Sequence, residues 1–415
     1  MCLEETSEVL TAWKQNELAG ITFPEGFVAS AVRCGLKTIG DDLALIVTES
    51  EASVAGVFTT NYVQAACVRY SRRVVKSGSA RAILVNAGNA NACNGDQGDA
   101  DNRQMAEWVS RRLNIAPDQV LTASTGIIGH LMPMEKLNSG IEMAVGALER
   151  DERVDQQASE AIMTTDTRPK RFAVEVDSDR WNAPIRFGGM CKGAGMIAPN
   201  MATMLAFLTT DVRLPAGLLQ DALTRAISAS FNCVTIDGDT STNDMCLLLA
   251  SGIGGAEISN LGDGFEDFVE ALTRVCITLA KEVARDGEGA TKLAEIVVRG
   301  AATESGAHKI ARTIAESPLV KTALFGNDPN WGRFMMAAGR AGVAFDPNRV
   351  NVFIGPHLVC RAGSSVEFDR AAAHNYLQSA EIRIELDLNV GDETAAVWTC
   401  DYSYDYIRIN AEYHT

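Results

Sequence analysis

The sequence contains no apolar run that approaches the length of a membrane span. Its longest apolar stretches, such as residues 201–208, are far shorter than the roughly 20 residues that a spanning helix requires. The first ten residues, MCLEETSEVL, are acidic and unlike a secretory signal. Positive charge is also scarce: 37 Lys and Arg stand against 53 Asp and Glu, a net charge of −16. We therefore expect a cytoplasmic protein with neither membrane nor nucleic-acid partners.

Familiar catalytic and metal-binding motifs are missing as well. The chain has no G-x-x-x-x-G-K-[ST], no H-E-x-x-H and no G-x-S-x-G, which argues against an NTPase, a zinc protease and an α/β-hydrolase. Ten cysteines form no C-x-x-C pair, and most lie in apolar runs, as expected of reduced core thiols. The five histidines are too dispersed to indicate a Ser/His or Cys/His pair.

One acidic segment, DGDTSTND at 237–244, carries groups that could bind Mg²⁺ or Ca²⁺. It lacks the glycine and the distal glutamate of an EF-hand loop. It is therefore more typical of a polar turn between two strands, and we expect no metal site.

The residues that are present describe a folded α/β protein. With 47% hydrophobic residues and 415 residues in all, the chain exceeds the usual size of one core, so two lobes are expected, with a boundary near 290: 1–290 and 291–415. Periodicity predicts a layered α/β or α+β fold, with sheets covered by helices. The expected helices are 101–114, 134–149, 155–165, 215–230, 264–285 and 368–379. The expected strands are 82–85, 118–129, 171–177, 183–188, 233–237, 245–251, 293–299, 350–355, 381–389, 394–402 and 406–410.

The stretch KGAGMIAPNMATMLAFLTTD, residues 192–211, runs from a glycine loop into an apolar strand, with Thr203 at the junction. A threonine there is ordinarily just a β-branched strand residue. As a nucleophile its hydroxyl would need a base. Cleavage of the Ala202–Thr203 bond would supply one, because a free α-amine with a pKa of about 7.7–8.0 is partly neutral near pH 7.

Seven ordered blocks of the chain resemble the ornithine acetyltransferase (glutamate N-acetyltransferase) family of arginine biosynthesis. They are the stretch above together with NAGNANACNG, ASTGIIG, IMTTDT, DGEGATK, NDPNWGR and the terminal NAEY-T. The resemblance implies an αββα sandwich like that of self-processing N-terminal-nucleophile enzymes, with a smaller C-terminal α/β lobe. It also implies a proenzyme that cuts itself before Thr203 into chains 1–202 and 203–415, which stay associated, as a heterotetramer of two α and two β chains.

The activity implied by the resemblance is acetyl transfer from N2-acetylornithine to L-glutamate. Thr203 would carry the acetyl group as an ester, which gives ping-pong kinetics. The resemblance implies no cofactor, although acetyl-CoA serves some members as a further acetyl donor.

The resemblance also assigns the other site residues. Thr125 and Gly126 would stabilise the oxyanion. The substrate would be bound by Thr164, Lys192, Thr203, Glu288, Asn410 and Thr415. Lys192 supplies the positive charge that an amino-acid carboxylate requires, and Glu288 could meet the substrate ammonium. The C-terminus would return to the site, held by the strand expected at 406–410.

Alternatives from other classes stay open at this point. A self-processing aminopeptidase or amidase of related fold would use the same nucleophile but pass the acyl group to water. A metal-dependent phosphoryl-transfer enzyme would be centred on residues 237–244, and a catalytically silent binding protein would remain uncut.

Overall fold

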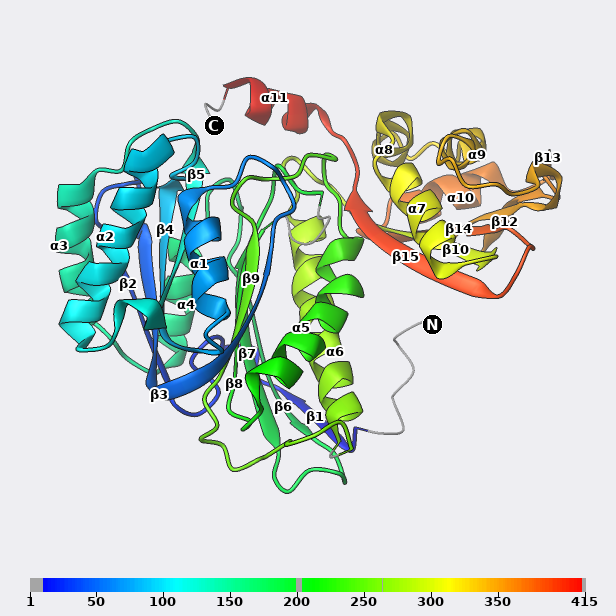
Figure 1. The fold of residues 1–415 in the computed structure, drawn as a ribbon. Coiled ribbons are helices and arrows are strands. Elements are labelled where there is room, and N and C mark those ends of the chain that lie inside the picture. The colour runs from blue at the N-terminus through cyan, green and yellow to red at the C-terminus, as the bar shows by residue number, and fades with distance from the viewer. Residues whose placement is uncertain (1–9, 199–203, 263, 413–415) are drawn as a thin grey trace.

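The computed structural model describes residues 10–198, 204–262 and 264–412. In these residues the main lobe is built on one mixed sheet of nine strands, in the order β1-β6-β7-β8-β9-β3-β4-β5, with β2 paired to β3 (Figure 1). The pairs β4/β5 and β8/β9 are parallel, and the other pairs are antiparallel. The strands are β1 (Ala12–Gln15), β2 (Phe27–Val32), β3 (Leu43–Phe58), β4 (Ser79–Asn89), β5 (Val120–Ile127), β6 (Lys170–Asp177), β7 (Ile185–Lys192), β8 (Leu205–Thr210) and β9 (Met245–Ala250).

Helices cover this sheet in two groups. The first group packs around β2–β5 and comprises α1 (Ala66–Val75), α2 (Gly95–Leu113), α3 (Met134–Gly146) and α4 (Glu152–Ala161). The second group, α5 (Ala216–Ser228) and α6 (Phe265–Arg285), packs on β3, β6 and β7. The ring of Phe268 on α6 lies 5.4 Å from that of Phe187 on β7. Helices therefore flank the sheet on both sides, which is the layered arrangement that the sequence predicts.

The C-terminal lobe has its own sheet, ordered β13-β12-β11-β14-β10-β15. Its strands are β10 (Leu293–Ala301), β11 (Asn351–Ile354), β12 (His357–Arg361), β13 (Ser364–Ser365), β14 (Glu381–Asp387) and β15 (Glu393–Cys400). Its helices are α7 (Glu304–Ala315), α8 (Pro318–Phe325), α9 (Trp331–Gly339) and α10 (Arg370–Leu377). A last helix, α11 (Tyr404–Glu412), leaves this lobe and extends over the main lobe (Figure 1). None of the helices within the described ranges is long and apolar enough to cross a membrane.

Two expected strands are wrong. Residues 233–237 are not a strand: a 3₁₀ turn at Phe231–Cys233 leads into a loop in which Val234 makes only an isolated bridge with Trp398. Residues 406–410 belong to α11 instead. The apolar–polar alternation of YIRIN fits a strand, but a strand also needs a neighbouring edge, and here local helical pairs form, including an ion pair of 3.1 Å between Arg408 and Asp405.

Candidate active site

The first part of the site is the C-terminal end of the strand β5, which carries Thr125 and Gly126. Gly126 pairs with Gly88 at the ends of the parallel strands β4 and β5. Its φ of +127° is a conformation for glycine, and a Cβ there would lie 2.3 Å from the carbonyl carbon of Gly88. This close approach of the two backbones explains why glycine follows Thr125.

Lys192, the last residue of β7, reaches this end of β5. Its Nζ donates a hydrogen bond of 3.4 Å to Oγ1 of Thr125. Because the hydroxyl oxygen accepts this bond, the hydroxyl hydrogen of Thr125 remains a donor for another group. Lys192 is buried, yet within the described ranges no carboxylate lies within 4.0 Å of its ammonium. A buried cation without a direct carboxylate partner is suited to bind a substrate carboxylate.

The sequence did not indicate Asp166, which organises the side of the site that contains Thr164. The buried Asp166 carboxylate accepts hydrogen bonds from the Thr164 amide at 3.1 Å, the Gly193 amide at 2.7 Å and Nζ of Lys170 at 2.6 Å. Burial raises the pKa of Asp166. The ammonium groups of Lys170 and Lys192 and the hydrogen bond from the Gly193 amide lower it by more, so that the pKa is about 2. Asp166 therefore stays ionised and holds Thr164 near the backbone that follows Lys192.

Lys170 and Asp286, which the sequence analysis did not identify as site residues, complete this network. Nζ of Lys170 also donates to Asp286 at 2.5 Å, and Asp286 accepts from the amide of Thr167. The acid–base–acid arrangement is buried and joins residues 166–170 to the residue that follows α6. The only sequence signal was the polar character of TTDT and DGEG, which is equally typical of a surface loop.

Glu288 and Asn410 meet on the other side of the glycine loop. The Glu288 amide donates to the carbonyl of Ala194 at 2.8 Å, and a Cβ on Gly195 would lie 2.5 Å from the Glu288 carboxylate. Nδ2 of Asn410, on α11, donates to Oε2 of Glu288 at 2.7 Å. The loop that follows Lys192 thus links Glu288 and Asn410 to Lys192 and Thr125. Asn410 reaches the site from a helix and not from the expected strand.

The segment predicted as a polar turn, 237–244, and the first residue of β9, Met245, are hydrogen-bonded to the main chain on the two sides of residues 199–203. Upstream, the Asp237 carboxylate accepts from the amides of Met196 at 2.6 Å and Ile197 at 2.8 Å. The hydroxyl of Thr240 donates to the carbonyl of Ala198 at 3.0 Å. Downstream, the Met245 amide donates to the carbonyl of Met204 at 3.0 Å. Three of the predicted site residues, Ala202, Thr203 and Thr415, lie outside the described residues.

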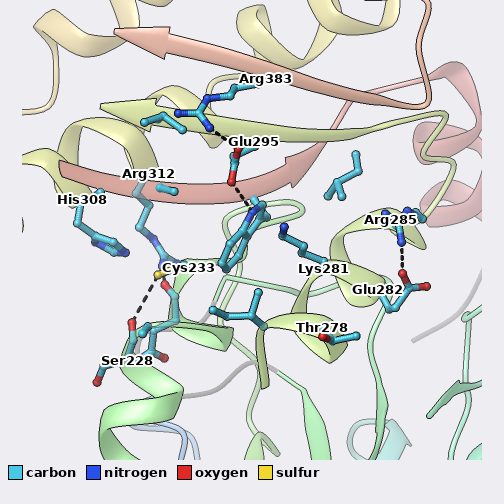
Figure 2. A pocket seen from close by; sticks show the side chains of 18 of the residues that line it. Ser228, Cys233, Thr278, Lys281, Glu282, Arg285, Glu295, His308, Arg312 and Arg383 are labelled. Carbon is cyan, nitrogen blue, oxygen red and sulfur yellow. Dashed lines mark hydrogen bonds and ion pairs between the residues drawn. The ribbon is translucent and has the colours of Figure 1, made fainter. Parts of the chain in front are cut away.

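A large cavity lies apart from these residues. It has a volume of about 1430 Å³ and separates α6 from the sheet of the C-terminal lobe. Figure 2 shows Glu295 hydrogen-bonded to Arg383 in the C-terminal lobe, and Lys281 of α6 among the other residues that line the cavity. None of the predicted site residues that the structure describes lines this cavity, although Ala198 and Thr240 lie at its wall.

A family model and several known proteins match almost the whole length of this chain. The ArgJ family model matches residues 28–415. The arginine biosynthesis bifunctional protein ArgJ of Synechocystis sp. is 49% identical over 415 residues, which cover 97% of this chain and 99% of that protein. A crystal structure of ArgJ from Bacillus halodurans is 40% identical, covers 49% of this chain and 97% of that chain, and gives a TM-score of 0.48. The ornithine acetyltransferase of Mycobacterium tuberculosis, complexed with ornithine, is 37% identical, covers 46% of this chain and 100% of that chain, and gives a TM-score of 0.43.

Proposed function

Because this chain belongs to the ArgJ family, we propose that it transfers the acetyl group of N2-acetylornithine to L-glutamate through an acetyl ester on Thr203. The chain is an acetyl-transferring enzyme of arginine biosynthesis. The proposal adds the two substrates, the nucleophile and the order of events. It also includes self-cleavage of the Ala202–Thr203 bond, which creates the α-amine that serves as base.

One observation carries the proposal: complementary charges converge on the loop that leads to residue 203. Lys192 and Thr125 lie on one side of this loop, and Glu288 with Asn410 lies on the other. Both proposed substrates carry a carboxylate, and each carries an ammonium group: on the side chain of N2-acetylornithine and on the α-carbon of glutamate. A buried ammonium and a buried carboxylate are the pair of charges that would bind such a substrate.

The reaction divides into two acyl transfers. The α-amine of Thr203 takes the hydroxyl proton while Oγ1 attacks the acetyl carbonyl of N2-acetylornithine. The Thr125 hydroxyl and the backbone amide of Gly126 would donate to the oxygen that becomes negative. The proton held by the α-amine passes to the departing amine, so ornithine leaves and an acetyl ester remains. The amine of glutamate then attacks this ester, and the Thr203 hydroxyl recovers its proton.

The proposal has several parts beyond the reaction itself. Chains 1–202 and 203–415 remain together in a cytoplasmic heterotetramer of two α and two β chains, without a cofactor. Thr415 joins the substrate-binding residues, and acetyl-CoA serves as a further donor. The lobes divide between 290 and 291, in the loop between α6 and β10. A self-processing aminopeptidase or amidase is not favoured, because the family relatives are named for arginine biosynthesis.

The test is to follow the chain and the acetyl group together. Wild-type protein of 44.4 kDa should separate into pieces of about 22 and 23 kDa, while Thr203→Ala stays whole. Incubation with N2-acetylornithine alone should leave one acetyl group at the residue that begins the second piece, and glutamate should remove it. Peptide mass spectrometry after rapid quenching detects the ester. An uncut wild-type chain with full activity, or acetyl release to water in place of glutamate, would disprove the proposal.

A further inference from the structure

The last helix, α11, carries a residue of the candidate site but has no buried face of its own. None of its residues is buried, and it extends from the C-terminal lobe over the main lobe (Figure 1). A helix of nine residues is only marginally stable in water, because helical stability in proteins comes mostly from packing of an apolar face. Directly before it, the hydroxyl of Ser403 donates to the carbonyl of Gly289 at 2.5 Å. This single bond fixes where the helix begins, but the direction in which it points requires further contacts.

The direction of α11 is given by an aromatic pair at its start. The rings of Tyr402, which precedes the helix, and Tyr406, in its first turn, are stacked with centroids 4.6 Å apart and an angle of 16° between their planes. Tyr406 is bonded to Asn410 in turn, because Nδ2 of Asn410 donates to the Tyr406 carbonyl at 3.0 Å and to Oε2 of Glu288 at 2.7 Å. An amide nitrogen has two hydrogens, so the two bonds can form together. The contact between Asn410 and Glu288 therefore depends on the position of Tyr406.

Lys321 of α8 supports the aromatic pair from the C-terminal lobe. Its side chain is fully buried, and Nζ lies 4.6 Å from the centre of the Tyr402 ring, within reach of a cation–π interaction. Nζ also donates to Oγ1 of Thr399 at 2.8 Å and to the carbonyl of Cys400, at the end of β15. In the main chain, the Tyr402 amide donates to the Lys321 carbonyl at 3.3 Å. Lys321 thus holds both the backbone and the ring of the residue on which Tyr406 stacks.

Packing alone does not explain an ammonium at this position. Within the described ranges Lys321 forms no ion pair with a carboxylate, and burial lowers its pKa. Removal of an ammonium from water costs free energy, whereas an uncharged side chain of similar length would fill the same space without that cost. The groups that the ammonium contacts, the end of β15 and the Tyr402 ring, are therefore the groups through which it acts.

We propose that Lys321 is a positioning residue for Glu288, the group proposed to bind the substrate ammonium, an inference that rests on the function proposed above. The contacts lead from Lys321 to the ring of Tyr402, from that ring to Tyr406, and along one turn of α11 to Asn410. Without the ammonium the Tyr402 ring is held less firmly, α11 moves more freely, and Asn410 is bonded to Glu288 for a smaller fraction of the time. The consequence is weaker binding of N2-acetylornithine, with the chemical steps unchanged.

The first experiment measures KM and kcat for N2-acetylornithine at saturating glutamate. Lys321→Met removes the ammonium and Tyr402→Leu removes the ring, so each should raise KM by about 3- to 30-fold and leave kcat within about 2-fold of wild type. Tyr402→Phe keeps the ring and should keep the wild-type KM. Lys281→Met is the matched control, because Lys281 also lies over an aromatic ring, 5.4 Å from the centre of Trp398, but on α6 and away from α11. It should keep the wild-type KM.

Two further measurements distinguish positioning from a general structural role. In an Asn410→Ala background, Lys321→Met should raise KM no further, because the bond that it supports is already absent, whereas independent effects would multiply. Hydrogen exchange of the folded enzyme, followed by mass spectrometry, should be faster in α11 of Lys321→Met and Tyr402→Leu than in wild type. The exchange rates do not depend on whether acetyl is transferred.

The possible results separate this inference from the proposed function. A wild-type KM in both Lys321→Met and Tyr402→Leu would overturn the inference alone, as would multiplying effects of Lys321→Met and Asn410→Ala or an equal rise of KM in Lys281→Met. If Lys321→Met does not fold, Tyr402→Leu and Tyr402→Phe provide the same comparison, because Tyr402 is only half-buried. A wild-type enzyme that transfers no acetyl group to glutamate would disprove the proposed function, and unchanged exchange in α11 would then overturn the inference separately.

Discussion

The carboxylate of Glu288 accepts a hydrogen bond of 2.7 Å from the amide nitrogen of Asn410, which is 122 residues further along the chain. Glu288 is buried beside the glycine loop of the main lobe, whereas Asn410 belongs to the last helix, beyond the C-terminal lobe. The bond therefore connects the end of the chain to the site and fixes one oxygen of the carboxylate proposed to meet the substrate ammonium.

Loss of this bond should weaken the binding of ornithine. A hydrogen bond to a charged group contributes about 1.5–3 kcal/mol, so Asn410→Ala should raise KM for N2-acetylornithine by roughly 10- to 100-fold, with a smaller effect on kcat. Steady-state kinetics with varied donor at saturating glutamate measures the change. Glu412→Ala, an exposed residue on the same helix, serves as the control. An unchanged KM in Asn410→Ala would show that α11 does not support substrate binding.

Oxyanion stabilisation can be tested at Thr125. Thr125→Ala removes the hydroxyl donor and also the acceptor of the bond from Lys192, so kcat should fall by about 10- to 1,000-fold. Thr125→Ser keeps the hydroxyl and should recover most of the rate. Stopped-time assays of acetyl transfer, with circular dichroism to confirm folding, provide the measurement. Equal rates for the Ala and Ser variants would remove the Thr125 hydroxyl from the mechanism.

The buried network around Asp166 predicts a dependence of stability on pH. The folded-state pKa of Asp166 is lowered to about 2 from an ordinary value of 3.8, so its contribution is fully present above the unfolded value. That contribution is lost as the pH falls from about 4 to about 2. Asp166→Asn should cost about 3 kcal/mol at pH 7, because it leaves Lys170 with Asp286 as its one remaining carboxylate partner in the described structure.

Urea unfolding at pH 7, 4 and 2.5 measures this difference. The difference in free energy of unfolding between wild type and Asp166→Asn should become smaller towards the lowest pH. The control variant Asp118→Asn, at an exposed position, should have the wild-type free energy of unfolding at every pH. If the difference in free energy of unfolding stays constant down to pH 2.5, ionised Asp166 does not stabilise the fold.

The sequence alone determined the family and several of the helices and strands. Apolar periodicity marked α6 and α5, and a buried apolar run marked β9, because each of these segments buries a continuous face whatever its neighbours are. The resemblance of the ordered motifs to the family predicts that Thr125, Lys192, Glu288 and Asn410 belong to one site.

The tertiary structure decided how these residues meet and which partners they need. Asp166 and Lys170 stand in polar stretches that resemble surface loops, and their burial became apparent only when β6, the glycine loop and the end of α6 packed together. The segment 406–410 alternates like a strand, but in the structure its backbone forms part of the helix α11. Periodicity indicates that a side chain is buried, whereas the identity of its partner depends on contacts between distant segments of the chain.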